Sequence, residues 1–144
     1  MDRRSLWIGC VVALLCAATS AHAQDYEERC GAASGNICFT GGDLWMSAGT
    51  TLATAAVRLQ MQSDGNLALY DNTGRALWGA GTYNYGGAQL GFTRDGNLAI
   101  YYNQRVLFST GTAGRGSYLA LQRDGNLVIY DAKNTPVWSI FPIR

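Results

Sequence analysis

The sequence predicts an all-β protein with pseudo-threefold symmetry, and three observations lead to that prediction. A segment centred on Asp-Gly-Asn occurs three times, with its aspartates 31 and 29 residues apart. A fixed spacing in this range is typical of proteins that build one small unit several times. On both sides of each Asp-Gly, apolar and polar residues alternate, which is typical of half-buried strands. A large aromatic residue also recurs at intervals of 30 residues, at Trp78, Phe108 and Trp138.

Residues 1–23 have the features of a secretory signal peptide. Arg3 and Arg4 give a positive start, the stretch from Leu6 to Ala18 is almost wholly apolar, and Ala21-His22-Ala23 fits a small-x-small cleavage site. The apolar stretch is too short for a comfortable membrane span. We therefore expect cleavage after Ala23, a secreted or periplasmic protein, and no membrane span in the mature chain.

The composition of residues 24–144 argues against several classes of function. Asp2, Arg3 and Arg4 leave with the signal, so 11 basic and 10 acidic residues become nine of each. Nucleic-acid binding depends on a basic excess, so we expect no nucleic-acid partner. The only histidine, His22, is lost as well. Without histidine or a free thiol, the mature chain cannot form a Ser-His-Asp or Cys-His nucleophile, and it lacks the usual zinc ligands. We expect no enzyme, no metal and no cofactor.

The N-terminal segment 24–39 is expected to carry a local disulfide. Cys10 and Cys16 leave with the signal, and only Cys30 and Cys38 remain. In an oxidising compartment, two cysteines this close most simply pair with each other. The rest of the chain, 40–144, is long enough for one domain with one core.

Each repeat is expected to begin with a hairpin. Asp-Gly between alternating runs favours a tight turn, and the loop Ser63-Asp64-Gly65 fits a type I turn that ends in a left-handed glycine. Gln62 then faces Asn66, and the leucines occupy the opposite, inward face. The inward-facing residues expected in the three hairpins are Leu59, Met61, Leu67, Leu69, Leu90, Phe92, Leu98, Ile100, Leu119, Leu121, Leu127 and Ile129.

A third strand is expected after a polar turn such as Asp71-Asn72-Thr73-Gly74. It carries the recurring aromatic residue, and the equal spacing predicts that the three aromatics meet near the pseudo-threefold axis. The segment 41–52 is expected to supply the first strands and to close the last sheet. Little of the mature chain is expected to be helical.

A polar face beside each turn predicts a sugar site. Gln, Asp, Asn and Tyr at fixed offsets provide the donors and acceptors that a sugar diol needs, and the small apolar residue between Asn and Tyr suits the C–H patch of a pyranose. Turn chemistry alone would explain Asp-Gly-Asn, but not Gln and Tyr at fixed offsets. The candidate residues are Gln122, Asp124, Asn126, Val128 and Tyr130 in repeat three, Gln62, Asp64, Asn66, Ala68 and Tyr70 in repeat one, and Asp95, Asn97 and Tyr101 in repeat two.

At these residues the chain resembles the bulb-type, or snowdrop-like, mannose-binding lectins of monocots, whose site motif is Gln-x-Asp-x-Asn-x-Val-x-Tyr. The resemblance covers nearly the whole mature domain. It implies a β-prism II fold, in which three four-stranded antiparallel sheets surround a pseudo-threefold axis. It also implies metal-independent binding of mannose-containing glycans through O2, O3 and O4, with a homodimer formed by exchange of C-terminal strands as one option.

The match to the family motif differs between repeats. Repeat three is complete, whereas Ala68 replaces Val in repeat one, and Thr93 and Ala99 replace Gln and Val in repeat two. We therefore expect repeat three to bind best and repeat two to be a weak third site. Gly65 stands where many plant members have the first cysteine of an internal disulfide. The alternative function is a protein-interaction or structural module on the same fold. A β-trefoil is disfavoured, because its Gln-x-Trp repeats are absent.

Overall fold

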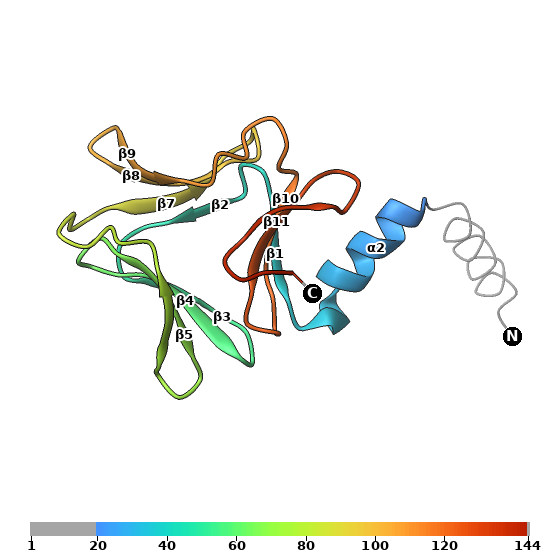
Figure 1. The fold of residues 1–144 in the computed structure, drawn as a ribbon, viewed down its shortest axis with the longest axis horizontal. Helices are drawn as coiled ribbons and strands as arrows, with labels where there is room; N and C mark the ends of the chain where they lie inside the picture. The colour runs from blue at the N-terminus through green and yellow to red at the C-terminus, as the bar shows by residue number, and fades with distance from the viewer. Residues whose placement is uncertain (1–19, 144) are drawn as a thin grey trace, which may run out of the picture.

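The computed structural model describes residues 20–143, so most of the predicted signal peptide lies outside the described residues. Within this range, strands dominate (Figure 1). The strands are β1 (Ile37–Thr40), β2 (Leu44–Met46), β3 (Thr50–Ala53), β4 (Val57–Met61), β5 (Leu67–Asp71), β6 (Ala76–Gly79), β7 (Gln89–Phe92), β8 (Leu98–Tyr102), β9 (Arg105–Ser109), β10 (Tyr118–Leu121), β11 (Leu127–Tyr130) and β12 (Pro136–Ser139).

The strands form three four-stranded sheets, and all their pairings are antiparallel. The strand orders are β3-β4-β5-β6 for repeat one, β2-β7-β8-β9 for repeat two and β1-β10-β11-β12 for repeat three. In Figure 1 the three sheets surround a common centre as the faces of a prism. This is the β-prism II arrangement that the resemblance implies.

The strand that closes the last sheet begins earlier than expected. Residues 41–52 supply β2 and most of β3, which join the sheets of repeats two and one. The outer strand of the last sheet is instead β1, which pairs along its length with β10, so that Ile37 lies opposite Leu121 and Phe39 opposite Leu119. Ile37 and Phe39 pack against the core. The expectation for 41–52 was therefore wrong in this respect, and β1 lies almost wholly in the segment 24–39 that was expected to precede the domain.

The core contains all twelve residues that were expected to face inward, and each is at most 1% exposed. Full burial of such a side chain contributes about 1.5–3 kcal/mol, so these residues dominate the stability of the domain. The three recurring aromatics also meet as expected. Phe108 lies edge-to-face with Trp78 at 5.9 Å and with Trp138 at 6.4 Å between ring centroids.

The three hairpin turns share one geometry. In repeat one, the Gln62 amide donates to the Asn66 carbonyl at 2.9 Å, and the Gly65 amide donates to the Gln62 carbonyl at 3.0 Å. Gly65 has a left-handed φ of 92°, and Gly96 and Gly125 repeat it at 87° and 96°. The predicted turn, with a glycine in the left-handed region, is confirmed in each repeat.

A helix that the sequence did not predict lies outside the prism, next to the sheet of repeat three (Figure 1). It is α2 (Ala21–Cys30), and the short 3-10 turn η1 (Ala32–Ser34) follows it. Ser20 caps its first turn, and no residue of α2 is buried. The expected disulfide between Cys30 and Cys38 is present and connects the end of α2 to β1. Among residues 20–143, no helix has the length and apolar character that crossing a membrane requires.

Candidate functional site

The three sets of motif residues occupy equivalent places on three different sheets. In each hairpin the small apolar residue has a partner on both sides: Ala68 lies between Gln60 and Gly79, and Val128 lies between Ala120 and Ser139. The tyrosine follows two residues later and therefore lies on the same face. The structure thus brings the residues of one repeat together and keeps the three sets apart, so each is treated as a separate site.

Site three, formed by Gln122, Asp124, Asn126, Val128 and Tyr130, is held by a continuous set of hydrogen bonds. The Tyr130 hydroxyl donates to Gln122 Oε1 at 2.6 Å, and Gln122 Nε2 donates to Asp124 Oδ2 at 3.0 Å. Asp124 Oδ1 accepts from the Asn126 amide at 2.9 Å. The Asn126 side chain exchanges two 3.0 Å bonds with the backbone of Phe141. These bonds fix the polar atoms in place before any ligand arrives, and Asn126 Nδ2 keeps a second N–H for a ligand.

All five residues of site three line one hollow of about 860 Å³. Its remaining lining residues are Arg29 of α2 and the C-terminal residues Phe141, Pro142 and Ile143. Figure 1 shows the C-terminus beside α2, in agreement with this lining. Within the hollow Val128 is 0% exposed and Tyr130 is 6% exposed. The N-terminal helix and the C-terminal tail therefore form the walls of site three, and the motif residues form its floor.

Arg29 is a site residue that the sequence analysis missed. Its guanidinium lies 4.1 Å above the centre of the Tyr130 ring, and its Nη1 donates to the Tyr118 hydroxyl. Burial raises the pKa of both the Tyr118 and the Tyr130 hydroxyl, and Arg29 partly opposes this rise, through its hydrogen bond to Tyr118 and through its charge beside Tyr130. Both hydroxyls are therefore neutral donors at pH 7. Arg29 lies far from the motif in sequence, and only its position beside Cys30 could have pointed to it.

Site one, formed by Gln62, Asp64, Asn66, Ala68 and Tyr70, is more open. Gln62 Nε2 donates to the Tyr70 hydroxyl, and Asp64 Oδ1 accepts from the Asn66 amide at 2.9 Å. Asn66 Oδ1 accepts from the Gly81 amide at 3.1 Å. Within the described part of the chain, no hydrogen bond involves Asn66 Nδ2. Site one therefore offers an amide donor that is not bound to the protein.

Site two, formed by Thr93, Asp95, Asn97, Ala99 and Tyr101, uses its polar groups internally. The Thr93 hydroxyl donates to Asp95 Oδ1 at 2.5 Å and, with the Asn97 amide, holds the pKa of that carboxyl below its usual value. Asn97 Nδ2 donates to Ser109 Oγ at 3.0 Å, and Asn97 Oδ1 accepts from the Thr112 amide at 3.2 Å. Because Thr93 stands where the other two sites have Gln62 and Gln122, site two lacks the side-chain amide of the motif.

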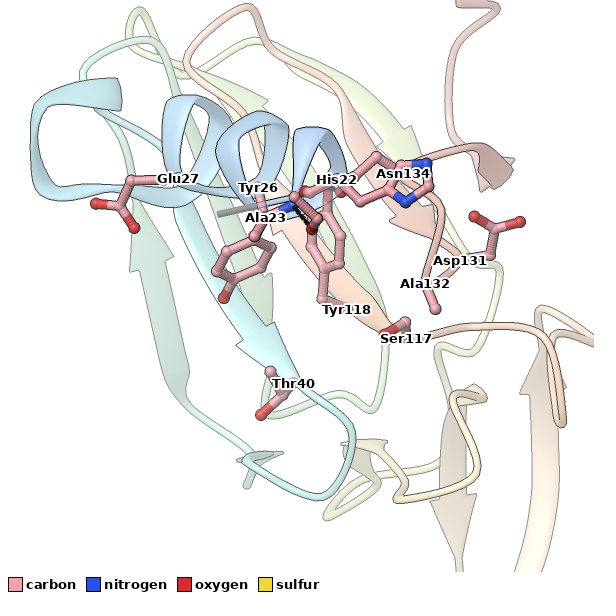
Figure 2. A pocket seen from close by; sticks show the side chains of 11 residues that line it. His22, Ala23, Tyr26, Glu27, Thr40, Ser117, Tyr118, Asp131, Ala132 and Asn134 are labelled. Carbon is pink, nitrogen blue, oxygen red and sulfur yellow. Dashed lines mark hydrogen bonds between the residues drawn. The ribbon is translucent and has the colours of Figure 1, made fainter. Parts of the chain in front are cut away.

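A second hollow near α2, of about 540 Å³, does not contain the motif residues (Figure 2). Figure 2 shows Tyr26 of α2 against Tyr118 on one side of it and Asp131 and Asn134 on the other. Part of its wall is Ser20, His22 and Ala23, which precede the expected cleavage position. This hollow is therefore not the candidate sugar site. Among residues 20–143, no three His, Cys, Asp or Glu side chains are grouped so that they could hold a metal ion.

Comparison with known proteins gave matches among solved structures only. No family model and no curated protein matches the chain. A monomeric monocot mannose-binding lectin from Gastrodia elata is 40% identical, with a TM-score of 0.64, over 74% of this chain and 96% of that one. The Polygonatum cyrtonema lectin, solved with a monomannoside, is 32% identical, with a TM-score of 0.58, over 74% of this chain and 94% of that one.

The mannose-specific agglutinin of snowdrop, Galanthus nivalis, solved with methyl-α-D-mannoside, is 29% identical with a TM-score of 0.59. That match covers 74% of this chain and 97% of the agglutinin. These proteins are lectins, which are not enzymes. Because the match to the Gastrodia lectin reaches 40% identity over nearly all of that protein, the chain belongs to the family of bulb-type mannose-binding lectins.

Proposed function

We propose that the protein is a secreted lectin that binds mannose-type glycans without a metal ion, through Gln-x-Asp-x-Asn-x-Val-x-Tyr sites. The observation that carries this proposal is that all five motif residues of repeat three line one hollow. The family relationship supports it, because the Polygonatum and snowdrop lectins were solved with mannosides. Site three is the main site in this proposal, site one is the second, and site two contributes little.

The chemistry of site three suits a vicinal diol. Asp124 provides a carboxylate acceptor, Asn126 an N–H donor, and the Tyr130 hydroxyl can accept a bond while it donates to Gln122. Each bond replaces one to water and contributes about 0.5–1.5 kcal/mol net. A monosaccharide is therefore expected to bind near the millimolar range, about −4 kcal/mol, and clustered glycans would bind more tightly through several sites.

Secretion is part of the proposal and rests on the sequence of residues 1–23. Cleavage after Ala23 would cut within α2 and remove the Ser20 cap, while the Cys30–Cys38 disulfide would still tie the end of the remaining helix to β1. A disulfide in this segment supports an oxidising compartment. N-terminal sequencing of protein from a secreting host tests this proposal, and Gln24 is the expected first residue.

Calorimetric titration of residues 24–144 with methyl-α-mannoside tests the binding proposal. We expect millimolar binding, unchanged by EDTA, and weaker binding of methyl-α-glucoside. Replacing Asp124 and Asp64 by Asn keeps an oxygen for each turn but removes the charged acceptor, and should weaken binding about tenfold. Asp95→Asn is the matched control and should change little. Loss of binding in EDTA, or methyl-α-glucoside binding that the Asp124 and Asp64 variants weaken as much as they weaken mannoside binding, would contradict the proposal.

A glycan array without any signal would favour the alternative, a protein-interaction or structural module on the same fold. Self-association by exchange of C-terminal strands stays a separate prediction. In the structure β12 pairs with β11 of its own chain. Light scattering of the purified protein distinguishes a monomer from a strand-exchanged homodimer.

A further inference from the structure

Trp45 is the most unusual residue on the outer face of the repeat-two sheet. It lies in β2, its side chain is 56% exposed, and the glycine opposite it in β7, Gly91, provides the surface on which the indole lies. A Cβ on Gly91 would come within 2.0 Å of Trp45 Cζ3. The sheet thus has a flat recess in its backbone at the point where the indole rests.

Two further contacts hold the indole in this position. Its ring stacks beside that of Tyr101, with centroids 5.5 Å apart and an angle of 21° between the planes. Its Nε1 donates to Gln89 Oε1 at 2.9 Å. A large apolar side chain without such contacts would move freely and lose its orientation on binding, whereas this one is oriented in advance.

The indole forms one side of a hollow of about 570 Å³ with a polar rim. Its lining also includes Gln89, Asn103 and Gln104, whose side chains end in amides, and Tyr101 and Tyr102. The indole occupies only the Oε1 atom of Gln89, and within residues 20–143 no hydrogen bond involves Gln89 Nε2. An amide donor therefore lies next to the open indole, which is the combination of apolar face and oriented polar groups found in small-ligand sites.

From this geometry we propose that Trp45 is the platform of a separate sugar site, which binds β-linked glucose-type pyranoses by stacking. The face of an aromatic ring is negative and attracts the slightly positive C–H groups of a sugar. When all ring hydroxyls are equatorial, both sugar faces consist of axial C–H groups and can lie flat on the indole. Mannose has an axial O2, so only one of its two faces can lie flat on the indole. The rim amides can bind the equatorial hydroxyls at the edge of the same ring.

This site shares Tyr101 with site two of the mannose motif, but its platform, Trp45, and its other lining residues lie outside the motif. Thr93 and Ala99 replace the Gln and Val of the motif on this sheet, so it retains less of the motif than the other two sheets. The inference goes beyond the proposed function and does not depend on it, because that function rests on sites three and one, which lie on the other two sheets.

Tryptophan fluorescence of residues 24–144 with cellotriose, a β-1,4-linked glucose trimer, tests the proposal. Trp45 is more exposed than Trp78 and Trp138, so its emission should shift to shorter wavelength and resist acrylamide quenching as the trimer binds. In Trp45→Ala the affinity should fall about tenfold or more, whereas Trp45→Phe should keep part of it. Gly91→Ala leaves the indole present but displaced, and should weaken binding as Trp45→Ala does.

Mannoside titration of the same variants separates this inference from the proposed function. Trp45→Ala should bind methyl-α-mannoside as the wild type does. Cellotriose binding by a protein that ignores mannose would support the inference and contradict the proposed function. Equal cellotriose affinity in wild type and Trp45→Ala would overturn the inference. So would light scattering that shows a wild-type dimer and a Trp45→Ala monomer, because the indole would then be a contact between two copies.

Discussion

The guanidinium of Arg29 lies 4.1 Å above the ring of Tyr130, so a helix outside the prism contacts the floor of site three. Such a cation–π contact contributes about 0.5–1 kcal/mol when exposed and about 2 kcal/mol or more when shielded from water. Two further contacts hold the helix against the sheet. One is the Cys30–Cys38 disulfide, and the other is the edge-to-face contact between the rings of Tyr26 and Tyr118, whose centroids are 4.7 Å apart. The N-terminal segment is therefore part of the candidate site and not a detached leader.

Replacing Arg29 by Ala should weaken mannoside binding at site three about threefold to tenfold. Arg29 has five N–H donors, and only the Tyr118 hydroxyl accepts from its side chain within the described residues, so donors remain for a sugar. Arg29→Lys should fall between wild type and Arg29→Ala, because it keeps the charge without the planar group. Titration calorimetry measures the effect, with the exposed Arg94→Ala as control. An unchanged affinity in Arg29→Ala would remove Arg29 from the site.

Three Tyr→Phe variants should rank the three sites. Tyr130→Phe removes a hydroxyl from site three and should lower total mannoside affinity the most, roughly fivefold. Tyr70→Phe should have a smaller effect, and Tyr101→Phe almost none, because the Tyr101 ring lies against Trp45. Each change removes one oxygen and keeps the ring, so the core is undisturbed. A larger loss in Tyr101→Phe than in Tyr130→Phe would reverse the ranking.

Replacing Cys30 and Cys38 together by Ser should release the N-terminal segment without unfolding the prism. In the chain-entropy model a loop this short stabilises by only roughly 2–3 kcal/mol. Thermal unfolding should therefore remain cooperative at a lower Tm, and limited proteolysis should remove residues 24–30. Mass spectrometry of the unreduced wild type is the control, and it should find no alkylatable thiol. A variant that fails to fold at all would show that the bridge is essential to the domain.

Gly96→Ala should destabilise the domain far more than Gly125→Ala, although both residues occupy the same turn position. A left-handed φ costs a non-glycine residue roughly 1–2 kcal/mol in both cases. A Cβ at Gly96 would also meet the carbonyl oxygen of Gly116 at 1.8 Å, whereas at Gly125 the nearest atom is a Val57 methyl at 3.5 Å. Urea unfolding of the two variants should differ by more than about 2 kcal/mol. If both variants lost the same free energy of unfolding, the Gly116 backbone would have to move aside at little cost, which would contradict this prediction.

Acid should weaken the β5–β6 turn through Asp71. The Thr73 hydroxyl, followed by the Arg75 amide, lowers the pKa of this carboxyl from its ordinary 3.8 to about 2. Because the pKa is lower in the folded state, the carboxylate stabilises the protein above about pH 4, and this contribution is lost as the pH falls towards 2. The difference in Tm between wild type and Asp71→Asn should therefore be constant from pH 7 to about pH 4 and shrink by pH 2. A difference that persists at pH 2 would contradict the assignment.

The hairpins and the core could be predicted from the sequence because their signals are local. The alternation around Leu59 and Leu67 and the Asp-Gly turn each lie within a few residues, and the same signals occur three times. The partner of β1 could not be found in this way. Ile37 and Phe39 alternate with more polar residues, as strand residues do. They pair with Leu121 and Leu119, and no local sequence signal indicates a partner so far along the chain.

The helix and the role of Trp45 were missed for a related reason. Gln24–Cys30 has Tyr26 as its main apolar residue, so it shows no helical period, and its contacts with Tyr118 and the disulfide hold it in place. In the sequence, Trp45 stands between the apolar residues Leu44 and Met46, as an outward-facing strand residue would. Only the pairing of β2 with β7, which sets Trp45 opposite Gly91, shows why its indole lies flat on the sheet.

The order of the first three strands has a consequence for how the chain folds. β1, β2 and β3 are consecutive in sequence, yet each completes a different sheet. The partner of β1 is β10, Tyr118–Leu121, which lies near the other end of the chain. Contacts between such distant segments give a high contact order, which slows folding and links all parts of the domain. Repeat one is continuous from β3 to β6, whereas repeats two and three take their outer strands, β2 and β1, from the N-terminal part of the chain. Sites three and two therefore depend on strands that precede repeat one, and a chain shortened past β2 should lose both sites while it keeps all four strands of the sheet of site one.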